Sequence, residues 1–310
     1  MVTVCGAQVL EVLGVTVIIV ALPVIAVDLD LPGGQQQLVI SLYAVLYGAL
    51  LLTAGRVGDV VGRRHLLLAG LVVSLVGALG CAVAGTGVVL LVGRAVQGLG
   101  GAMVTPAALA LVTTAFPTGS SRRTAISAWT AAAAGGGALG FGAGGILVET
   151  AGWRAVFWLL AAVAALLTLA ACALVPAETA GQRRGRGFDP AGTLTIEAGL
   201  VLLVVGAGQL ENPDAGTAAA LVMLAASVLL LLAFVATQRF GRDPLLGWAA
   251  LTNHSFVLAC GVAFVNTATT SASGTLVALV AADVFGLRPL LTGLGRVSER
   301  SGVGSARLDG

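Results

Sequence analysis

The sequence consists largely of long apolar runs separated by short polar connections. Nine such runs, bounded by glycine, proline or charged residues, lie at about residues 4–27, 37–55, 66–84, 87–113, 124–148, 153–175, 191–209, 217–236 and 255–281. A helix needs about 20 consecutive apolar residues to cross a bilayer, and inside lipid only helices and closed barrels satisfy the backbone hydrogen bonds. The period-two alternation of a membrane barrel is absent. The sequence therefore predicts an all-α, polytopic helical membrane protein.

The composition excludes several other classes of protein. Hydrophobic residues make up 58% of the chain and charged residues 10%, whereas a soluble domain has about 25% charged residues. A soluble enzyme, a disordered chain and a nucleic-acid-binding protein are therefore excluded. The four cysteines stand alone in apolar runs, and His65 and His254 lie in connections, so we expect no metal site, no cofactor and no enzymatic chemistry within the membrane.

All sixteen basic residues are arginines, and their placement predicts the orientation. The connections after the second, fourth, sixth and eighth runs contain Arg56, Arg63, Arg64, Arg122, Arg123, Arg183, Arg184, Arg186, Arg239 and Arg242. The connections after the first, third, fifth and seventh runs contain a single arginine, Arg154. Because cytoplasmic loops carry the excess of basic residues, we expect a multi-pass protein of the cell membrane with a cytoplasmic amino terminus.

The longest polar stretch suggests a domain boundary. Residues 177–190, rich in glycine and arginine, are predicted to form a cytoplasmic linker after a six-helix unit at residues 1–176. Two further helices are expected within residues 191–237, and one more within residues 238–295. The charged tail at residues 296–310 contains no apolar run.

The connection after the second run carries the most specific motif of the chain. Three glycines spaced by three and four residues share one helical face, on which another helix can pack closely, and Asp59 lies one turn before Arg63. This stretch resembles the signature loop of the major facilitator superfamily, G-x-x-x-D-x-x-G-R-R/K. The matching residues are Gly55, Gly58, Asp59, Gly62, Arg63 and Arg64. The resemblance implies that they form a cytoplasmic gating loop.

The fourth run contains an arginine at membrane depth. Placing Arg94 there costs about 2.5–3.5 kcal/mol, so its side chain must face a protein partner or a watery cavity. Arg94, Gln97 and Gly98 resemble the second signature of the same family, R-x-x-Q-G. That signature implies a role in proton transfer; the alternative is a structural arginine that pairs with a backbone carbonyl or an acid.

The first run resembles a drug-exporter pattern, L-D-x-T-x-V-N-V-A-L-P, between Leu13 and Pro23. Gly14 stands where the pattern has its acid, and Ile19 stands where it has its amide. Glu11 lies three residues before Gly14 and therefore on the same helical face. Glu11 either replaces the missing acid or extends to the cytoplasmic interface.

The fifth run contains glycines spaced by four residues, which form one smooth helical face. Gly136, Gly140, Gly144 and Gly145 match the antiporter signature G-x-x-x-G-P-x-x-G-G, except that Phe141 replaces its proline. The same stretch spells G-x-G-x-x-G, but it follows no strand, so nucleotide binding is not expected. The replacement of the proline leaves antiport open as an assignment.

Two more stretches extend the resemblance over residues 1 to about 295. Residues 152–157 match G-W-R-x-x-F, and residues 188–192 resemble the start of the two extra central helices of the fourteen-helix drug:proton antiporter branch. The resemblance implies a major facilitator fold that exports drugs or other amphiphilic compounds in exchange for protons. Arg94, Gln97 and Glu11 would then line the proton-coupling and substrate cavity.

A fourteen-helix member of this branch has six helices, two linker helices and six more helices. The present chain contains the first half, both linker helices and one further helix, so we expect a product truncated after the ninth helix. The alternative function is therefore a transporter fragment without transport activity of its own. Such a fragment is expected either to associate with itself or with a complementary fragment, or to be cleared by proteases.

The arginine placement generates a prediction about topology. In a cysteine-free version of the protein, a single cysteine at Gly33 should react with a membrane-impermeant thiol reagent in intact cells. A cysteine at Ser120 should react only after the membrane is opened. The opposite labelling pattern would contradict the predicted orientation.

Overall fold

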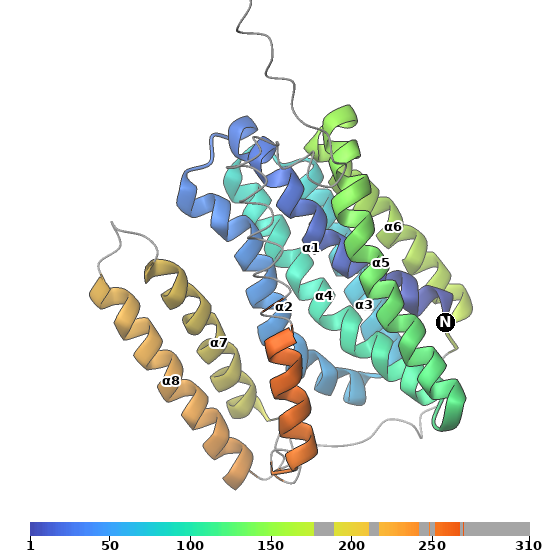
Figure 1. The fold of residues 1–310 in the computed structure, drawn as a ribbon, viewed down its shortest axis with the longest axis vertical. Coiled ribbons are helices and arrows are strands. Elements are labelled where there is room, and N and C mark those ends of the chain that lie inside the picture. Colours follow the sequence, from blue (N-terminus) through green and yellow to red (C-terminus); the bar gives the residue numbers. More distant parts are fainter. Residues whose placement is uncertain (177–188, 211–216, 242–247, 249–251, 267–268, 270–310) are drawn as a thin grey trace, which may run out of the picture.

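The computed structural model is a set of long, roughly parallel helices (Figure 1). It describes residues 1–176, 189–210, 217–241, 248, 252–266 and 269. The long helices are α1 (Val2–Asp28), α2 (Gly33–Val61), α3 (Arg63–Ala82), α4 (Gly87–Ala115), α5 (Gly119–Ala151), α6 (Trp153–Leu174), α7 (Pro190–Leu210) and α8 (Thr217–Phe240). These eight are long and apolar enough to cross a membrane. The prediction of an all-α polytopic membrane protein is confirmed.

The ninth predicted helix lies partly outside the described residues. A shorter apolar helix, His254–Asn266, covers the first part of the predicted run at 255–281. Most of the predicted linker at 177–190 and the whole tail at 296–310 also lie outside the described part of the chain.

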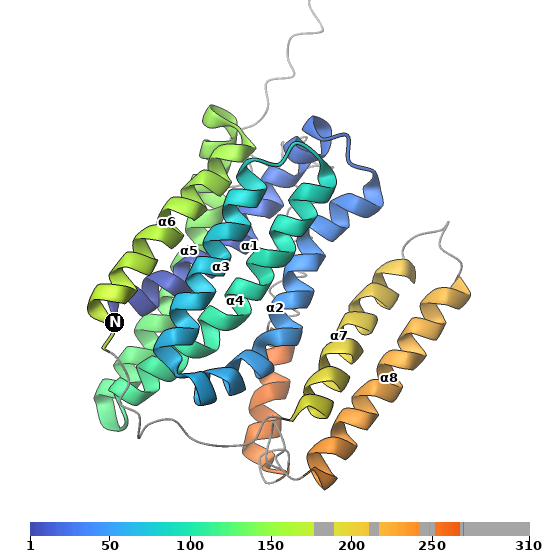
Figure 2. The ribbon, with the colours of Figure 1, turned by 180° about the vertical axis from the view of Figure 1, so that it is seen from behind.

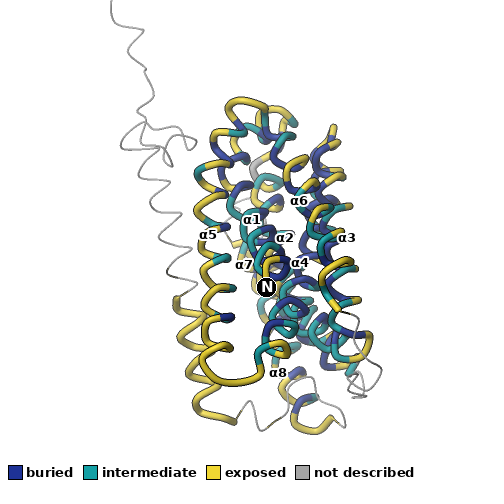
Figure 3. The backbone as a smooth tube through the Cα atoms, turned by 90° about the vertical axis from the view of Figure 1, so that its right-hand side faces the viewer, coloured by how far each residue is buried: buried dark blue, intermediate teal, exposed yellow. Residues whose placement is uncertain are grey.

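Helices α1 to α6 pack into one bundle. The main pairs are α3 with α4 and α6, α2 with α4, and α1 with α5. Seen from behind, α3 and α4 stand side by side with α6 next to α3 (Figure 2). The side chains of Leu67, Leu71, Leu90 and Phe157 are completely buried in the apolar core between these helices. The outward face of α5 is largely exposed, as expected for a surface that meets lipid (Figure 3). Most residues of α8 are also exposed or half-buried.

The second helix is longer than its apolar run predicts, because the loop motif continues the helix as far as Val61. The helix ends at Gly62, whose φ of 106° is strained for residues with a side chain. Helix α3 begins at the next residue, Arg63. The connection between α2 and α3 is therefore a single glycine, and so short a turn restricts the angle between the two helices.

The glycines of α5 lie against α1. A Cβ atom on Gly136 would stand 2.9 Å from the carbonyl oxygen of Val9, and one on Gly144 would stand 2.8 Å from Val17 Cγ2. A Cβ on Gly140 would overlap with the side chain of Thr16. The absence of side chains on this face of α5 is what permits the close approach of the two helices.

Helices α7 and α8 form a hairpin that stands beside α2 (Figures 1 and 2). Ile196 and Phe234 are the buried residues of its small apolar cluster, which Leu52 of α2 joins. The hydroxyl of Thr53 donates a hydrogen bond of 2.6 Å to the carboxyl of Glu197. In the described part of the chain, the hairpin is thus attached to the six-helix bundle mainly through α2.

A polar clasp closes the end of the bundle at which α1 terminates. Trp153 Nε1 and Arg154 Nη1 donate hydrogen bonds of 3.0 Å and 2.8 Å to the same carboxylate oxygen of Asp28. Arg154 Nη2 also donates to the carbonyl of Ala84 at 3.0 Å. The G-W-R-x-x-F motif therefore ties the start of α6 to the end of α1 and to the connection between α3 and α4.

The α1–α5 contact generates a matched pair of substitutions. Gly140→Leu should lower the free energy of unfolding by about 2 kcal/mol or more, because an overpacked side chain at this contact costs about 1–3 kcal/mol. Gly142→Leu is the control, since no atom lies within 4 Å of a Cβ at that position. Unfolding midpoints in detergent and the yield of monodisperse protein measure the difference. Equal losses in both variants would show that the Gly140 face does not make the contact.

Candidate functional site

Five polar side chains are buried together between α1, α2, α3 and α4. They are Glu11, Tyr43, Ser74, Arg94 and Gln97, with 0–6% of each residue exposed. In the interior of a membrane protein, such groups are costly unless they bind one another, and they mark functional sites. We refer to these five residues as the polar cluster.

Glu11 is the acid of the polar cluster. The hydroxyl of Tyr43 donates a hydrogen bond of 3.0 Å to its Oε2 atom, and the hydroxyl of Ser74 donates one of 3.1 Å to its Oε1 atom. The carboxyl thus joins α1 to α2 and α3. Of the two interpretations of Glu11, the structure excludes an interfacial side chain, because the residue is only 5% exposed.

Arg94 is bound mainly by backbone carbonyls. Its Nε donates to the carbonyl of Val39 at 3.0 Å, and its Nη1 donates to the carbonyl of Gly14 at 3.3 Å and to Gln97 Oε1 at 2.9 Å. Its Nη2 has no hydrogen-bond partner in the described part of the chain. The guanidinium also lies over the ring of Tyr43, with 4.4 Å between Cζ and the ring centroid.

Tyr43 therefore connects the acid to the arginine, by its hydroxyl on one side and by its ring on the other. Two glycines of α4 make this possible. A Cβ on Gly98 would lie 2.6 Å from the carbonyl oxygen of Tyr43, and a Cβ on Gly101 would lie 3.0 Å from the tyrosine hydroxyl and overlap with Glu11. The glycine of R-x-x-Q-G thus lets α2 approach α4 closely enough to place Tyr43 over Arg94.

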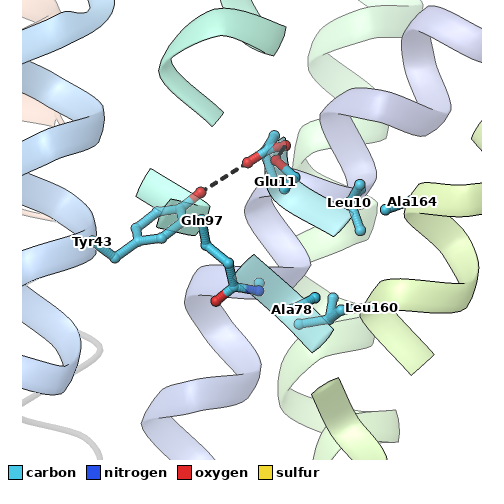
Figure 4. Close-up of a pocket in the computed structure, with 9 residues that line it drawn as sticks. Leu10, Glu11, Tyr43, Ala78, Gln97, Leu160 and Ala164 are labelled. Atoms are coloured by element: carbon cyan, nitrogen blue, oxygen red, sulfur yellow. Dashed lines mark hydrogen bonds between the residues drawn. The ribbon is translucent and has the colours of Figure 1, made fainter. Parts of the chain in front are cut away.

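A small internal cavity adjoins the polar cluster (Figure 4). It is lined by Leu10, Glu11, Gly14, Tyr43, Ser74, Ala78, Gln97, Leu160 and Ala164. The space that the centre of a water molecule can reach is about 20 Å³, and about 10–15 Å³ is enough to hold one water. Glu11 and Gln97 are both among the residues that line this space.

The residues predicted to form a gating loop lie apart from the polar cluster, at the end of the bundle where α1 begins. Asp59 and Arg63 are 3.7 Å apart, one helical turn from each other. Arg63 also donates a hydrogen bond to the hydroxyl of Thr114 at the end of α4. Arg64 Nη2 donates to the carbonyl of Cys172 at the end of α6, at 2.8 Å. The loop between α2 and α3 therefore binds the ends of two other helices.

The three predicted groups of residues thus have different positions. Arg94, Gln97 and Glu11 lie together in the polar cluster, whereas Gly136, Gly140, Gly144 and Gly145 lie buried along α5. Of the three glycines in the gating loop, a Cβ on Gly58 would lie 2.9 Å from Leu66 of α3, while one on Gly55 would make an ordinary 3.8 Å contact with Pro106. Gly62 serves the turn itself.

Sequence reasoning missed Tyr43 and Ser74. Both lie in apolar runs, and neither belongs to a recognised motif. A signal was present in the tyrosines: the chain contains two, Tyr43 and Tyr47, placed one helical turn apart in an apolar run. Their rings stack with centroids 5.8 Å apart.

A comparison with protein families identifies the fold. Residues 4–295 match the family model described as Major Facilitator Superfamily. The chain belongs to the major facilitator superfamily. The match extends over nearly the entire sequence and includes the gating loop, the polar cluster and the hairpin of α7 and α8.

Several curated proteins resemble this chain. It is 38% identical over 249 residues to the puromycin resistance protein pur8 of Streptomyces alboniger, an alignment that covers 79% of this chain and 48% of the relative. It is 37% identical to the cephamycin export protein CmcT of Amycolatopsis lactamdurans, covering 78% of this chain and 50% of the relative. The multidrug resistance protein Stp of Mycobacterium tuberculosis is 31% identical, with 89% and 51% covered. The chain spans about half the length of these relatives.

Solved structures show the same fold. A crystal structure of a peptide transporter POT in complex with sulfate aligns with a TM-score of 0.59 at 20% identity, covering 94% of this chain and 64% of that one. The POT family transporter PepTSo aligns with a TM-score of 0.53 at 16% identity, covering 75% and 51%. These structures show the fold, and the family match makes the chain a multi-pass membrane protein of a transporter family rather than of an enzyme family.

The polar cluster generates a prediction about stability. Tyr43→Phe should lower the free energy of unfolding by about 1–3 kcal/mol, because it removes a donor from a buried carboxyl. Tyr47→Phe is the matched control, since its hydroxyl donates only to the half-buried Thr105 hydroxyl, at 2.9 Å. Unfolding in mixed micelles, followed by the loss of helical signal, measures both. A smaller loss for Tyr43→Phe than for Tyr47→Phe would contradict the arrangement.

Proposed function

We propose that this chain forms the first part of a proton-coupled exporter of drugs or other small amphiphilic compounds, in the fourteen-helix branch of the superfamily. The names of the relatives support this proposal, since they include a puromycin resistance protein, a cephamycin export protein and a multidrug resistance protein. The hairpin of α7 and α8 supports the assignment to the branch with two extra central helices.

The observation that carries the proposal is the buried carboxyl of Glu11 close to the buried guanidinium of Arg94. Such a carboxyl can exchange a proton, and its electrostatic environment then changes by a full charge. In the ionised state it accepts hydrogen bonds from Tyr43 and Ser74. In the protonated state it accepts more weakly, and the hydroxyl of Tyr43 becomes free to form another bond.

Glu11 thereby takes the role of the acid that the drug-exporter pattern has at position 14. The two positions are three residues apart on one face of α1, and the carbonyl of Gly14 binds Arg94. The acid and the amide of the pattern are thus replaced by a carboxyl one turn away and by Gln97 of α4, which binds the same arginine.

The driving force for export is the entry of protons. A proton that moves down the membrane potential supplies about 2.3 kcal/mol per 100 mV, in addition to the pH gradient. We propose that Glu11 carries this proton and that the cavity beside it holds the water that exchanges it. Substrate would bind on the same side of α1 and α4, since transporters of this kind hold their substrate near the middle of the bilayer between two repeats.

The remaining predicted residues act on access to this cavity. We propose that the gating loop, through Arg63 and Arg64, fixes the ends of α4 and α6 in one of the two access states, and that this end faces the cytoplasm. The glycine face of α5 keeps α1 packed against α5 while the six-helix half, residues 1–176, moves as a unit. The proposed division is a six-helix half at residues 1–176, a linker at 177–190, two extra helices at 191–237, and the start of the second half at 238–295.

A second candidate function follows from the lengths of the relatives, about half of which this chain covers. A protein limited to these 310 residues would present one side of a site that needs two. It is then expected to insert and to associate with itself or a complementary fragment, but not to transport.

Flux measurements in proteoliposomes test the proposal. In a transporter that contains these residues, Glu11→Gln and Arg94→Ala should each lower pH-driven export of an amphiphilic cation at least tenfold, without lowering the amount inserted. Glu149→Gln is the matched control, because Glu149 is an exposed acid near the end of α5. Flux that survives both cluster substitutions would contradict proton coupling through this site.

The same assay distinguishes the two candidates. The 310-residue protein alone should give no export above empty liposomes if it represents half of a site. Export by the purified 310-residue protein would contradict the second candidate and would favour a transporter that is rebuilt from two copies.

A further inference from the structure

A large groove opens between α1 and α5 at the end of the bundle where both helices begin. Its volume is about 750 Å³, which is within the range of about 300–1,000 Å³ typical of ligand pockets. The walls include Val2, Cys5 and Val9 of α1, and Ala125 and Ala128 of α5. We call it the α1–α5 groove.

The groove exists because the glycine contact covers only part of the two helices. Gly136, Gly140 and Gly144 hold α5 against residues 9 to 17 of α1. Before Gly136, the lining positions of α5 carry alanine, serine and threonine, and here the pocket opens. The side chains are too small to fill the space between the helices at this end.

The α1–α5 groove is distinct from the polar cluster. Val9 lines the groove and Glu11 lines the internal cavity, and two residues correspond to about 200° around a helix. The groove thus lies on the opposite side of α1. An occupant here does not have to compete with a group bound at Glu11 or Arg94, and the inference does not depend on the proposed function.

Chemical character changes along the groove. Its inner part is apolar, whereas the hydroxyl groups of Ser120, Ser121 and Thr124 line the part formed by the first turns of α5. Arg122 and Arg123 lie between these residues in the sequence and are exposed. The groove has no acidic residue among its lining residues in the described structure. An apolar slot therefore ends at hydroxyl groups, and two exposed arginines that do not line it stand in the same helical turn.

The start of α5 adds to the positive potential at this end of the groove. Thr118 precedes the helix and accepts no side-chain capping hydrogen bond, so the first backbone N–H groups of α5 remain open to an anion. The helix dipole favours negative charge at this end. The guanidinium of Arg122 reaches back to the carbonyl of Pro117 at 3.2 Å, which holds its charge close to the start of the helix.

We propose that the α1–α5 groove binds an anionic phospholipid. One acyl chain lies between Val9, Cys5 and Ala128, and the phosphate lies at the first turn of α5, near Arg122 and Arg123. Basic sites between membrane helices bind anionic head groups in this way. The positive charge near the start of α5 favours an anionic head group, and the apolar walls of the groove bind the acyl chain. The bound lipid completes the packing of the first turns of α1, which α5 does not cover.

Native mass spectrometry of the detergent-purified 310-residue protein tests this proposal. Phosphatidylglycerol and phosphatidylcholine with the same acyl chains are added in equal amounts, and the lipid retained per protein is counted. The wild-type protein should retain phosphatidylglycerol in clear preference. Ala128→Trp should lower the retention of both lipids, because the indole fills the groove. Ala131→Trp, at an exposed position of α5 outside the groove, should retain both.

The arginines provide the second, independent arm. Arg122→Gln and Arg123→Gln should each lower the preference for phosphatidylglycerol about fivefold and leave phosphatidylcholine unchanged. Arg239→Gln, at an exposed arginine near the end of α8, is the matched control. Equal retention of both lipids by the wild type, or an unchanged preference after both arginine substitutions, would overturn the proposal. A wild-type dimer that Ala128→Trp converts to a monomer would also overturn it, since a second copy would then occupy the groove.

Discussion

A guanidinium in the interior of a membrane protein has to be surrounded by acceptors, and this requirement organises the first four helices. Arg94 is completely buried, and its acceptors come from α1, α2 and its own helix. The carbonyls of a helix are normally used within that helix, so they can accept from a side chain only where another helix approaches very closely. Gly98 and Gly101 remove the side chains that would prevent this approach. Gly98 and Gly101 of α4 are therefore needed for the helix packing that brings backbone carbonyls within reach of Arg94.

The hydrogen-bond partners of Arg94 are uncharged groups, whereas the nearby carboxyl of Glu11 can gain or lose a charge. Main-chain carbonyls and the amide of Gln97 do not change their charge, so they hold the arginine in the same way whether or not Glu11 is protonated. The carboxyl of Glu11 binds Tyr43 and Ser74 instead. A change of its charge acts directly on the hydroxyl of Tyr43, whose ring lies over the arginine. In the proposed proton cycle, Glu11 would change its charge while the backbone carbonyls and Gln97 still bind Arg94.

The sequence was sufficient for the helices and for the individual motifs, but not for the contacts between them. Long apolar runs predict membrane helices because the hydrocarbon thickness fixes their length. The apolar run ends at about residue 55, but the glycines of the charged motif share one helical face, and α2 does continue through this motif to Val61. Tyr43 and Ser74 were missed because their role depends on which helix faces Glu11, and no spacing within one helix contains that information. The α1–α5 groove was unpredictable for the same reason, as it arises from the absence of contact between two helices that touch elsewhere.

The hydrogen bonds of Asp28 with Trp153 and Arg154 fix the end of α1 that lies away from the α1–α5 groove. One end is held by hydrogen bonds to α6, and the same arginine joins it to the connection between α3 and α4. The opposite end borders the α1–α5 groove. A helix of 27 residues is about 40 Å long, and Glu11 lies about 25 Å along its axis from Asp28. Between these two residues, α5 packs closely against Thr16 and Val17. Helix α1 is therefore supported at several levels and moves with the bundle as one rigid element.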